Sequence, residues 1–242
     1  MSRFRLVIRS LFFFWRVNLA VCMGVIAATA VLVGALLVGD SMRGSLRKIS
    51  LDGLGHIDEM LLTERFFRTE LANEIQADPR FQTEFERIAP IILFPNASAT
   101  FKKSDDQSSV ANKITLIGCT DDFWGFSADH VQPEVNGSLP EFDNPPSSIT
   151  TPVVLNEPLA NDLGISKSDL GKGSNPILTV QIPKPQLVNA DNPIGKKEDL
   201  YENIARLEVV DIIPAESLGR FHLHPSQLLP KIVFLPIATV QE

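Results

Sequence analysis

"VNLAVCMGVIAATAVLVGALLVGDSMRGSLRK", residues 17–48, is the stretch that decides the fold class of this chain. Within it, Leu19–Gly39 is a run of 21 residues without a charged side chain, bounded by Arg16 and Asp40. A helix of that length spans about 31 Å at about 1.5 Å per residue, and the hydrocarbon core of a bilayer is roughly 30 Å thick. One ionised side chain at its centre would cost about 2.5–3.5 kcal/mol on insertion. The run therefore predicts a transmembrane helix.

A cleaved signal peptide is the competing interpretation of the same run. The apolar core of a signal peptide is usually about 7–15 residues long, and a small-x-small cleavage site follows it. The run here is longer, and no such site follows it at a suitable distance. We therefore expect an uncleaved anchor, with residues 19–39 as the transmembrane helix.

The basic residues around the run set its expected orientation. Residues 1–18 contain four Arg and no acid, so the N-terminus is expected in the cytoplasm and residues 40–242 in the periplasm. Arg43, Arg47 and Lys48 on the far flank weaken this bias. On a helical wheel, three of the four N-terminal Arg lie within about 40° of one another. Residues 1–18 are thus expected to form an amphipathic lead at the headgroup boundary, although the same Arg also fit the simple positive flank of an anchor.

Small residues recur four apart inside the predicted membrane helix. Small side chains at this spacing let two helix backbones approach closely. They predict specific helix packing in the bilayer; the alternative is that Gly and Ala are simply common in membrane helices. The residues with this expected role are Gly24, Ala28, Ala30 and Gly34, and Ala35 and Gly39 repeat the spacing.

Charge is distributed unevenly along the chain. The first 39 residues carry four Arg and no acid, a charge of +4, while the remaining 18 basic and 29 acidic residues give −11, for a net charge of −7. Binding to nucleic acid needs clustered Lys and Arg against the phosphates. An acidic body of this kind excludes nucleic acid as the partner and leaves the lipid bilayer as the partner of the N-terminal segment.

No pattern in the chain predicts a cofactor. No G-x-x-x-x-G-K-[ST] loop occurs, and the glycine pairs at 53/55 and 171/173 lack the third glycine of a dinucleotide loop. Cys22 lies inside the apolar run and Cys119 far outside it, so the membrane would separate the two thiols. We expect two isolated cysteines, with Cys119 acting as a small buried hydrophobic residue.

A hydrolase hypothesis arises from Gly39-Asp40-Ser41, which resembles a nucleophile signature in which a later Asp-x-x-His supplies the base. Nucleophilic catalysis needs that base within hydrogen-bond reach of the hydroxyl. No Asp in the chain is followed three positions later by His. We therefore expect Asp40 and Ser41 to form the first turn of the membrane helix that is exposed to water. We expect no catalytic residues in the chain.

His222 and His224 are the only close pair of histidines. On a strand their side chains would face one way, as in some metal sites. No third ligand is marked nearby, and Pro225 follows directly. Loop histidines without a metal are the expected structure.

Residues 40–242 predict one α+β domain with a mixed sheet. Helical spacing continues the membrane helix through residues 41–51, and Phe123 and Trp124 in the turn 121–126 are expected in the core rather than on a cargo surface with Asp121 and Asp122. Glu157–Leu163 is expected as a short helix closed by Gly164. The polar stretches 102–112, 133–151 and 183–203 are expected as loops. Strands are expected at 56–62, 88–100, 113–119, 153–155, 177–182, 206–213 and 231–235, and a further helix at 64–75.

Several stretches, in this order, resemble the N-terminal part of bacterial ABC-transporter permeases of the FtsX/MacB type. They are "VLVGALLVGDSMRGSLRKISLDGLGHIDEMLL", "ITLIGCTDDFWGF", "TPVVLNEPLANDLGI" with "LTVQIPKP", and "LEVVDIIP" with "KIVFLPIATVQ". Together they extend over most of the chain. The more specific ones are Leu155–Ala160 and Gly118–Trp124.

This resemblance implies a first transmembrane helix followed by a MacB-like periplasmic core domain. It also implies a permease subunit that forms a homodimer and works with a separate ABC ATP-binding subunit. Such transporters convert ATP-driven movement in the cytoplasm into motion of the periplasmic domain, and they export or extract lipoproteins, peptides or drugs.

The resemblance fails at the C-terminal side, because the family has further membrane helices after the periplasmic domain. This sequence stops at Glu242. We expect an N-terminal fragment of the permease. The alternative is a single-pass, membrane-anchored periplasmic binding or sensor protein without an ATPase partner.

Overall fold

The computed structural model describes residues 9–63, 67–68, 70–103, 107–127, 131–134, 140–143, 150–171, 175–183, 201–223 and 228–241. Its contacts divide the chain into two compact units, Met1–Ile49 and Ser50–Glu242. Each unit is described here by itself.

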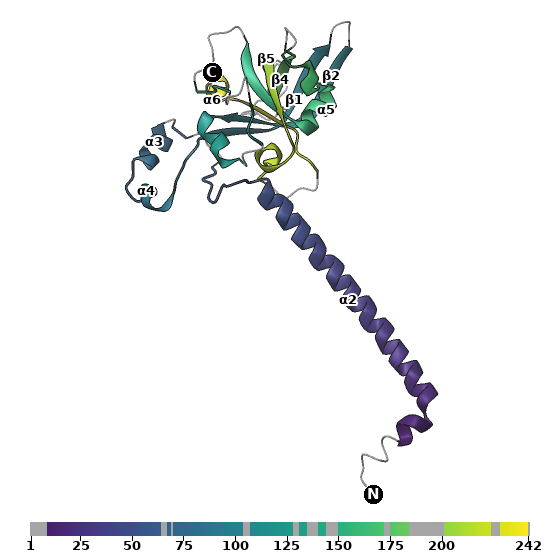
Figure 1. Ribbon diagram of the computed structural model, residues 1–242. Coiled ribbons are helices and arrows are strands. Elements are labelled where there is room, and N and C mark those ends of the chain that lie inside the picture. The colour runs from purple at the N-terminus through teal and green to yellow at the C-terminus, as the bar shows by residue number, and fades with distance from the viewer. Residues whose placement is uncertain are drawn as a thin grey trace, which may run out of the picture. The chain divides into compact units, whose positions relative to one another are not determined.

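The first unit is dominated by one long helix, α2, which runs from Trp15 to Asp52 over 38 residues (Figure 1). Within the described part of the chain, it is the one helix long and apolar enough to cross a membrane. The side chains of its apolar run are exposed in the structure. The predicted helix over residues 19–39 and its polar extension over residues 41–51 are both confirmed as parts of α2.

The lead before α2 is only partly described. Residues 9–13 are helical and a turn at Phe14 separates them from α2. The guanidinium carbon of Arg16 lies 5.7 Å from the centre of the Trp15 ring. Two of the four predicted lead arginines, Arg3 and Arg5, lie outside the described residues, so the expected basic stripe stays a prediction.

The second unit is built around a closed barrel of six strands in the order β1-β2-β6-β3-β5-β4, with β4 returning to β1. The pairs β2–β6 and β3–β5 are parallel and the other four pairs are antiparallel. The expected mixed sheet of an α+β domain is thereby confirmed, and its closure removes free strand edges along the paired stretches. The strands are β1 (Ile91–Lys103), β2 (Gln107–Cys119), β3 (Thr151–Asn156), β4 (Ile177–Pro183), β5 (Tyr201–Ile213) and β6 (Ile232–Pro236).

Short helices fill the connections of the barrel. Helix α5 (Glu157–Leu163) has Pro158 in its first turn, and its C-cap Gly164 is in the left-handed conformation with φ of 71°. The predicted helix and its closure by Gly164 are confirmed. The other short elements are α3 (Glu70–Gln76), α4 (Phe81–Glu84), the 3-10 helices η1 (Asp121–Phe126), η3 (Lys167–Asp169) and η4 (Ser217–Arg220), and α6 (Ile237–Gln241).

Two buried clusters make up the core of the barrel. The first cluster packs α5 against the inner face of the strands through residues such as Leu159 and Leu178. The second cluster is aromatic: the Trp124 and Phe234 rings are 4.9 Å apart, and the Phe123 and Phe221 rings meet edge to face at 5.9 Å. The expected burial of Phe123 and Trp124 is confirmed, so Trp124 takes no part in a cargo surface with Asp121 and Asp122.

Three expected elements are wrong. Residues 56–62 form no strand; they leave the end of α2 as a turn and an irregular segment. The loop expected over 102–112 is much shorter, because β1 extends to Lys103 and β2 begins at Gln107, with these two residues paired. In the stretch 183–203 expected as a loop, β5 begins at Tyr201.

The remaining expectations fall partly on residues outside the described set. The helix expected over 64–75 is described as α3, which begins at Glu70. Residues 184–200 and most of the loop expected over 133–151 lie outside the described residues. Thr151, the last residue of that expected loop, begins β3.

Candidate functional site: residues 52–57 of the second unit

Residues 52–57, which we call the joint, lie near the start of the second unit and contact the barrel of that unit. The amide of His56 donates a hydrogen bond to the carbonyl of Phe126 in η1 at 2.9 Å. Leu54 and Ile57 pack against the aromatic cluster. The chain therefore passes from the last turn of α2 directly into contact with the second core cluster.

Two glycines allow the joint to approach its neighbours closely. A Cβ on Gly53 would lie 2.8 Å from the carbonyl oxygen of Arg220 and 3.2 Å from Nδ1 of His222. Gly55 has φ of +58°, and a Cβ there would lie 2.4 Å from the carbonyl oxygen of Phe126. Both backbone contacts exclude side chains, and Gly55 also needs a conformation that side chains disfavour.

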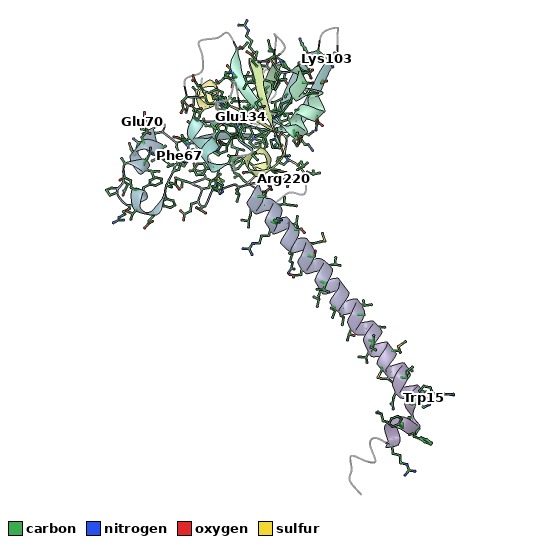
Figure 2. The ribbon with its side chains drawn as sticks, viewed as in Figure 1. Trp15, Phe67, Glu70, Lys103, Glu134 and Arg220 are labelled. Atoms are coloured by element: carbon green, nitrogen blue, oxygen red, sulfur yellow. The ribbon has the colours of Figure 1, made fainter. Side chains whose placement is uncertain are left out.

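Polar groups of η4 and the residues after it complete the joint. The Arg220 guanidinium (labelled in Figure 2) lies 4.0 Å from the Asp52 carboxylate at the end of α2. Nδ1 of His222 is 2.7 Å from the Arg220 carbonyl oxygen. Within the described part of the chain, Nε of Arg220 and Nε2 of His222 are buried without a hydrogen-bond partner. His222 lies in an irregular segment, as expected for a loop histidine, while His224 is outside the described residues.

The η1 turn beside the joint is held by a reciprocal pair of carboxylates. The Asp121 carboxylate accepts hydrogen bonds from the amides of Phe142, at 2.7 Å, and Asp143, at 3.4 Å. The Asp143 carboxylate in turn accepts one from the Asp121 amide at 3.4 Å. Desolvation by burial, and then the charge of Asp121, raise the pKa of Asp143. The pair fixes the loop at 140–143 onto η1 and gives Asp121 a structural role.

Replacing Asp143 by Asn is expected to raise the Tm at pH 7 and to leave it nearly unchanged near pH 4. Because the folded state raises the pKa of Asp143, it retains a proton that the unfolded state releases, so wild-type stability falls as pH rises above about 4. Asn has no charge, so it removes this loss of stability at neutral pH. Its side-chain oxygen still accepts the hydrogen bond from the Asp121 amide. Thermal unfolding across this pH range measures the effect, with Glu141→Gln as the control. A Tm difference that does not change with pH would contradict the assignment.

The residues predicted for helix packing lie on α2. Gly24, Ala28, Ala30 and Gly34 are all exposed, and nothing lies within 4 Å of a Cβ added to either glycine. Their role in packing stays a prediction. Gly39, Asp40 and Ser41 lie inside the same helix, not after a strand as the hydrolase hypothesis requires.

Among the described residues, neither cysteine belongs to a cluster of metal ligands. Cys119 is fully buried at the end of β2, and this burial raises the pKa of its thiol, with smaller contributions from Asp121 and Asp143. Its expected role as a buried hydrophobic residue is confirmed. Among the described residues, no group of three or more His, Cys, Asp or Glu side chains is placed to hold a metal ion.

Asn156 is an important residue that the sequence analysis did not single out by itself. Its side chain is fully buried and joins four segments. Its amide nitrogen donates to the carbonyls of Gly219, at 2.9 Å, and Pro230, at 2.7 Å. Its oxygen accepts from the amides of Leu159, at 3.3 Å, and Ile232, at 2.9 Å. The signal was its position directly before a Glu-Pro helix start, which is where a capping Asn is favoured.

Comparison with known proteins gives matches among solved structures alone. No family model matches the chain, and no curated protein matches it. Among solved structures, it is similar to the periplasmic region of MacB from Actinobacillus actinomycetemcomitans, with a TM-score of 0.31 and 15% sequence identity. The match covers 66% of this chain and 54% of that one, so the chain spans about half of the neighbour's length.

Proposed function

We propose that the chain is the N-terminal part of a permease subunit of an ABC transporter, with residues 40–242 in the periplasm. In this proposal α2 crosses the inner membrane, a separate subunit hydrolyses ATP in the cytoplasm, and the chain itself catalyses no reaction. Movement of α2 displaces the periplasmic barrel, which acts on a lipoprotein, peptide or drug. The sequence resemblance to FtsX/MacB-type permeases supports this assignment.

The observation that carries the proposal is the continuity of α2. One helix contains both the apolar run and the polar residues up to Asp52, and the hydrogen-bonded joint follows directly in the sequence. An anchor that only tethers a binding domain needs no such arrangement, because a Gly- and Ser-rich linker is sufficient. A helix that is followed directly in the sequence by residues hydrogen-bonded within the domain suits a protein that transmits displacement.

Small exposed residues on α2, such as Gly24 and Gly34, support the proposed homodimer, because they allow close helix contact in a bilayer.

The proposed orientation is tested by cysteine labelling in intact cells. We expect a membrane-impermeant maleimide to label Glu202→Cys in intact cells and Ser10→Cys only after the membrane is opened; both positions are exposed. The native thiols give little background, because Cys22 lies in the apolar run and Cys119 is buried with a raised pKa. The reverse pattern, or a mature chain lacking α2, would overturn the proposal.

The same cells distinguish the permease from the anchored sensor. Gentle detergent extraction and affinity purification of the chain should recover an ATP-binding subunit in a fixed ratio. Recovery of correctly oriented chain without any ATP-binding protein would favour the binding or sensor protein instead.

A further inference from the structure

A second surface of the barrel unit lies on the segment 70–87, which carries α3 and α4 beside the barrel (Figure 1). The two helices have 7 and 4 residues. Isolated helices shorter than about 12–15 residues are marginal in water, so these two depend on packing against each other. At α4, the rings of Phe81 and of the C-cap residue Phe85 stack at 5.3 Å.

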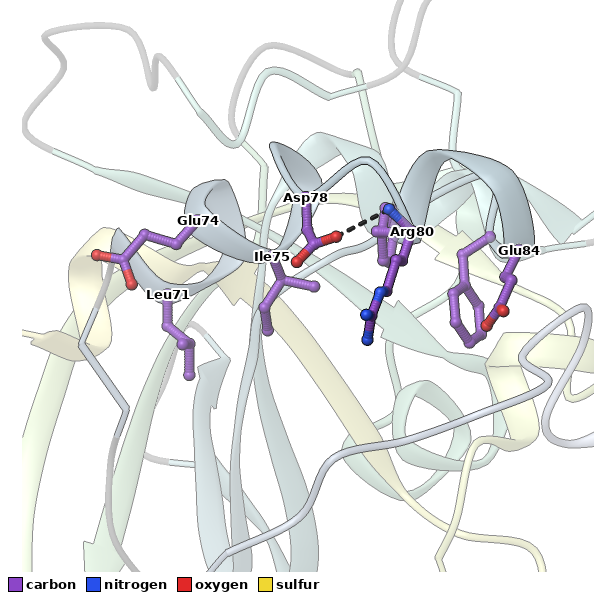
Figure 3. Close-up of a pocket in the computed structure, with 8 residues that line it drawn as sticks. Leu71, Glu74, Ile75, Asp78, Arg80 and Glu84 are labelled. Carbon is purple, nitrogen blue, oxygen red and sulfur yellow. Dashed lines mark hydrogen bonds between the residues drawn. The ribbon is translucent and has the colours of Figure 1, made fainter.

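A shallow groove of about 340 Å³ lies between α3 and α4 (Figure 3). Its apolar lining consists of Leu71, Ile75, Phe81 and Phe85, all of which are half-buried. This volume is near the lower end of the roughly 300–1,000 Å³ of ligand pockets, and the groove is open to solvent. It fits apolar side chains from one face of a helix better than it encloses a drug-sized molecule.

The rim of the groove is mainly acidic. It carries Glu74, Asp78 and Glu84 against a single Arg80. The Asp78 carboxylate accepts a hydrogen bond from the backbone amide of Arg80 at 2.8 Å. The Glu74 carboxylate forms an ion pair with the Arg68 guanidinium at 2.7 Å. Asp78 retains a second carboxylate oxygen and Glu84 lies at the other end of the lining, so negative charge remains on the rim after these pairings.

The position of the groove on the domain is fixed at its C-terminal side. The Arg87 guanidinium lies directly against the backbone of Gly125 in η1, where it occupies the space of a Cβ. Ala89 packs against the aromatic cluster. The groove is therefore connected, through a few residues, to the same cluster that receives the joint.

We propose that this groove is the docking site for a cationic amphipathic helix of another protein. The apolar face of that helix packs on Leu71, Ile75, Phe81 and Phe85, and its Lys or Arg side chains meet Asp78 and Glu84. A second copy of this chain is the poorer occupant, because an isologous contact would place two acidic rims together. Anionic lipid is the poorer occupant for the same electrostatic reason. This inference holds whether or not the chain works with an ATPase.

The test uses the full chain in nanodiscs of phosphatidylcholine, which lacks net charge. A fluorescent, helical Leu/Lys peptide is titrated and its anisotropy measured, with a Leu/Glu peptide of the same length as the matched ligand. We expect saturable binding of the Leu/Lys peptide alone, and weaker binding as salt increases. The double variant Asp78→Asn/Glu84→Gln should weaken it about ten-fold, while its apolar lining remains unchanged.

The matched control is Glu157→Gln/Glu202→Gln, which removes two exposed acids elsewhere on the domain. Equal loss of affinity in the two double variants would overturn the proposal, since it would indicate attraction by net charge alone. So would a Kd above about 1 mM for the wild type, or binding of the Leu/Glu peptide as tight as that of the Leu/Lys peptide. Thermal unfolding of each variant checks that the domain remains folded.

Discussion

Asn156→Leu is expected to lower the free energy of unfolding by about 3–5 kcal/mol. Leu has the same number and branching of side-chain heavy atoms as Asn but can neither donate nor accept a hydrogen bond. The change therefore leaves the amides of Leu159 and Ile232 and the carbonyls of Gly219 and Pro230 without their present partner. Each of these groups lies in or beside the core, where a lost partner costs about 1–3 kcal/mol before relaxation.

The loss affects several elements at once, because Asn156 links the end of β3 to α5, η4 and the start of β6. For a domain of this size, about 4 kcal/mol corresponds to a fall in Tm of roughly 8–16 °C. The measurement is urea unfolding of the detergent-solubilised chain followed by Trp124 fluorescence. A Trp15→Phe background removes the signal of the only other tryptophan.

Two further variants separate hydrogen bonding from volume. Asn175→Ala removes an amide that also makes two bonds, to Glu208 and from Gly171, but at a half-buried site. It should cost no more than about 1 kcal/mol. Asn156→Asp keeps the shape and should be most destabilising at neutral pH, because a carboxylate would face two carbonyls. A loss for Asn156→Leu as small as that for Asn175→Ala would contradict the proposed role of Asn156.

The strands that the sequence predicted correctly are those whose residues are buried. The five-residue strand β6 is buried throughout, and β3 is buried over Val153–Asn156. A short run of β-branched and aliphatic residues indicates such strands directly. Helix α5 was predictable for another reason, because both of its ends carry local signals that do not depend on the rest of the fold.

The elements that the sequence predicted wrongly depend on strand pairing rather than on hydropathy. Residues 100–103 and 107–110 are polar apart from Phe101 and Val110, yet they pair in register as the tip of the β1–β2 hairpin. A solvent-facing strand tip has no hydrophobic pattern to detect. Conversely, residues 56–62 were expected as a strand, but the amide of His56 donates its hydrogen bond to the carbonyl of Phe126 and the segment joins no sheet. Tertiary contacts override local propensity in both cases.

The joint could not be predicted as a site, although its glycines were visible. Gly53 and Gly55 were considered only as an incomplete nucleotide loop, and their real constraint is the proximity of Arg220 and Phe126, far away in the sequence. A single sequence does not show which distant backbone will approach a glycine. By contrast, the apolar run of α2 could be predicted, because length and the absence of charge are local properties.

Gly55→Ala is expected to destabilise the barrel unit by about 3–5 kcal/mol, which is the second large effect. The left-handed conformation alone costs a side-chain-bearing residue about 1–2 kcal/mol. At φ of +58°, the new Cβ would also lie 2.4 Å from the Phe126 carbonyl oxygen, which is backbone and cannot rotate away. Relief requires the joint to separate from η1, and this would break the hydrogen bond from His56 to the same carbonyl. Overpacking of this kind adds about 1–3 kcal/mol.

Gly164→Ala is the matched control, because Gly164 has φ of +71° and nothing within 4 Å of the added Cβ. It should show the conformational cost alone, about 1–2 kcal/mol. The difference between the two variants in urea unfolding therefore measures the close contact between the joint and η1. If the two losses are equal, the joint is not packed as tightly as the structure shows. If Gly55→Ala alone unfolds the domain, the joint is an integral part of the fold of the second unit, as the proposed function requires.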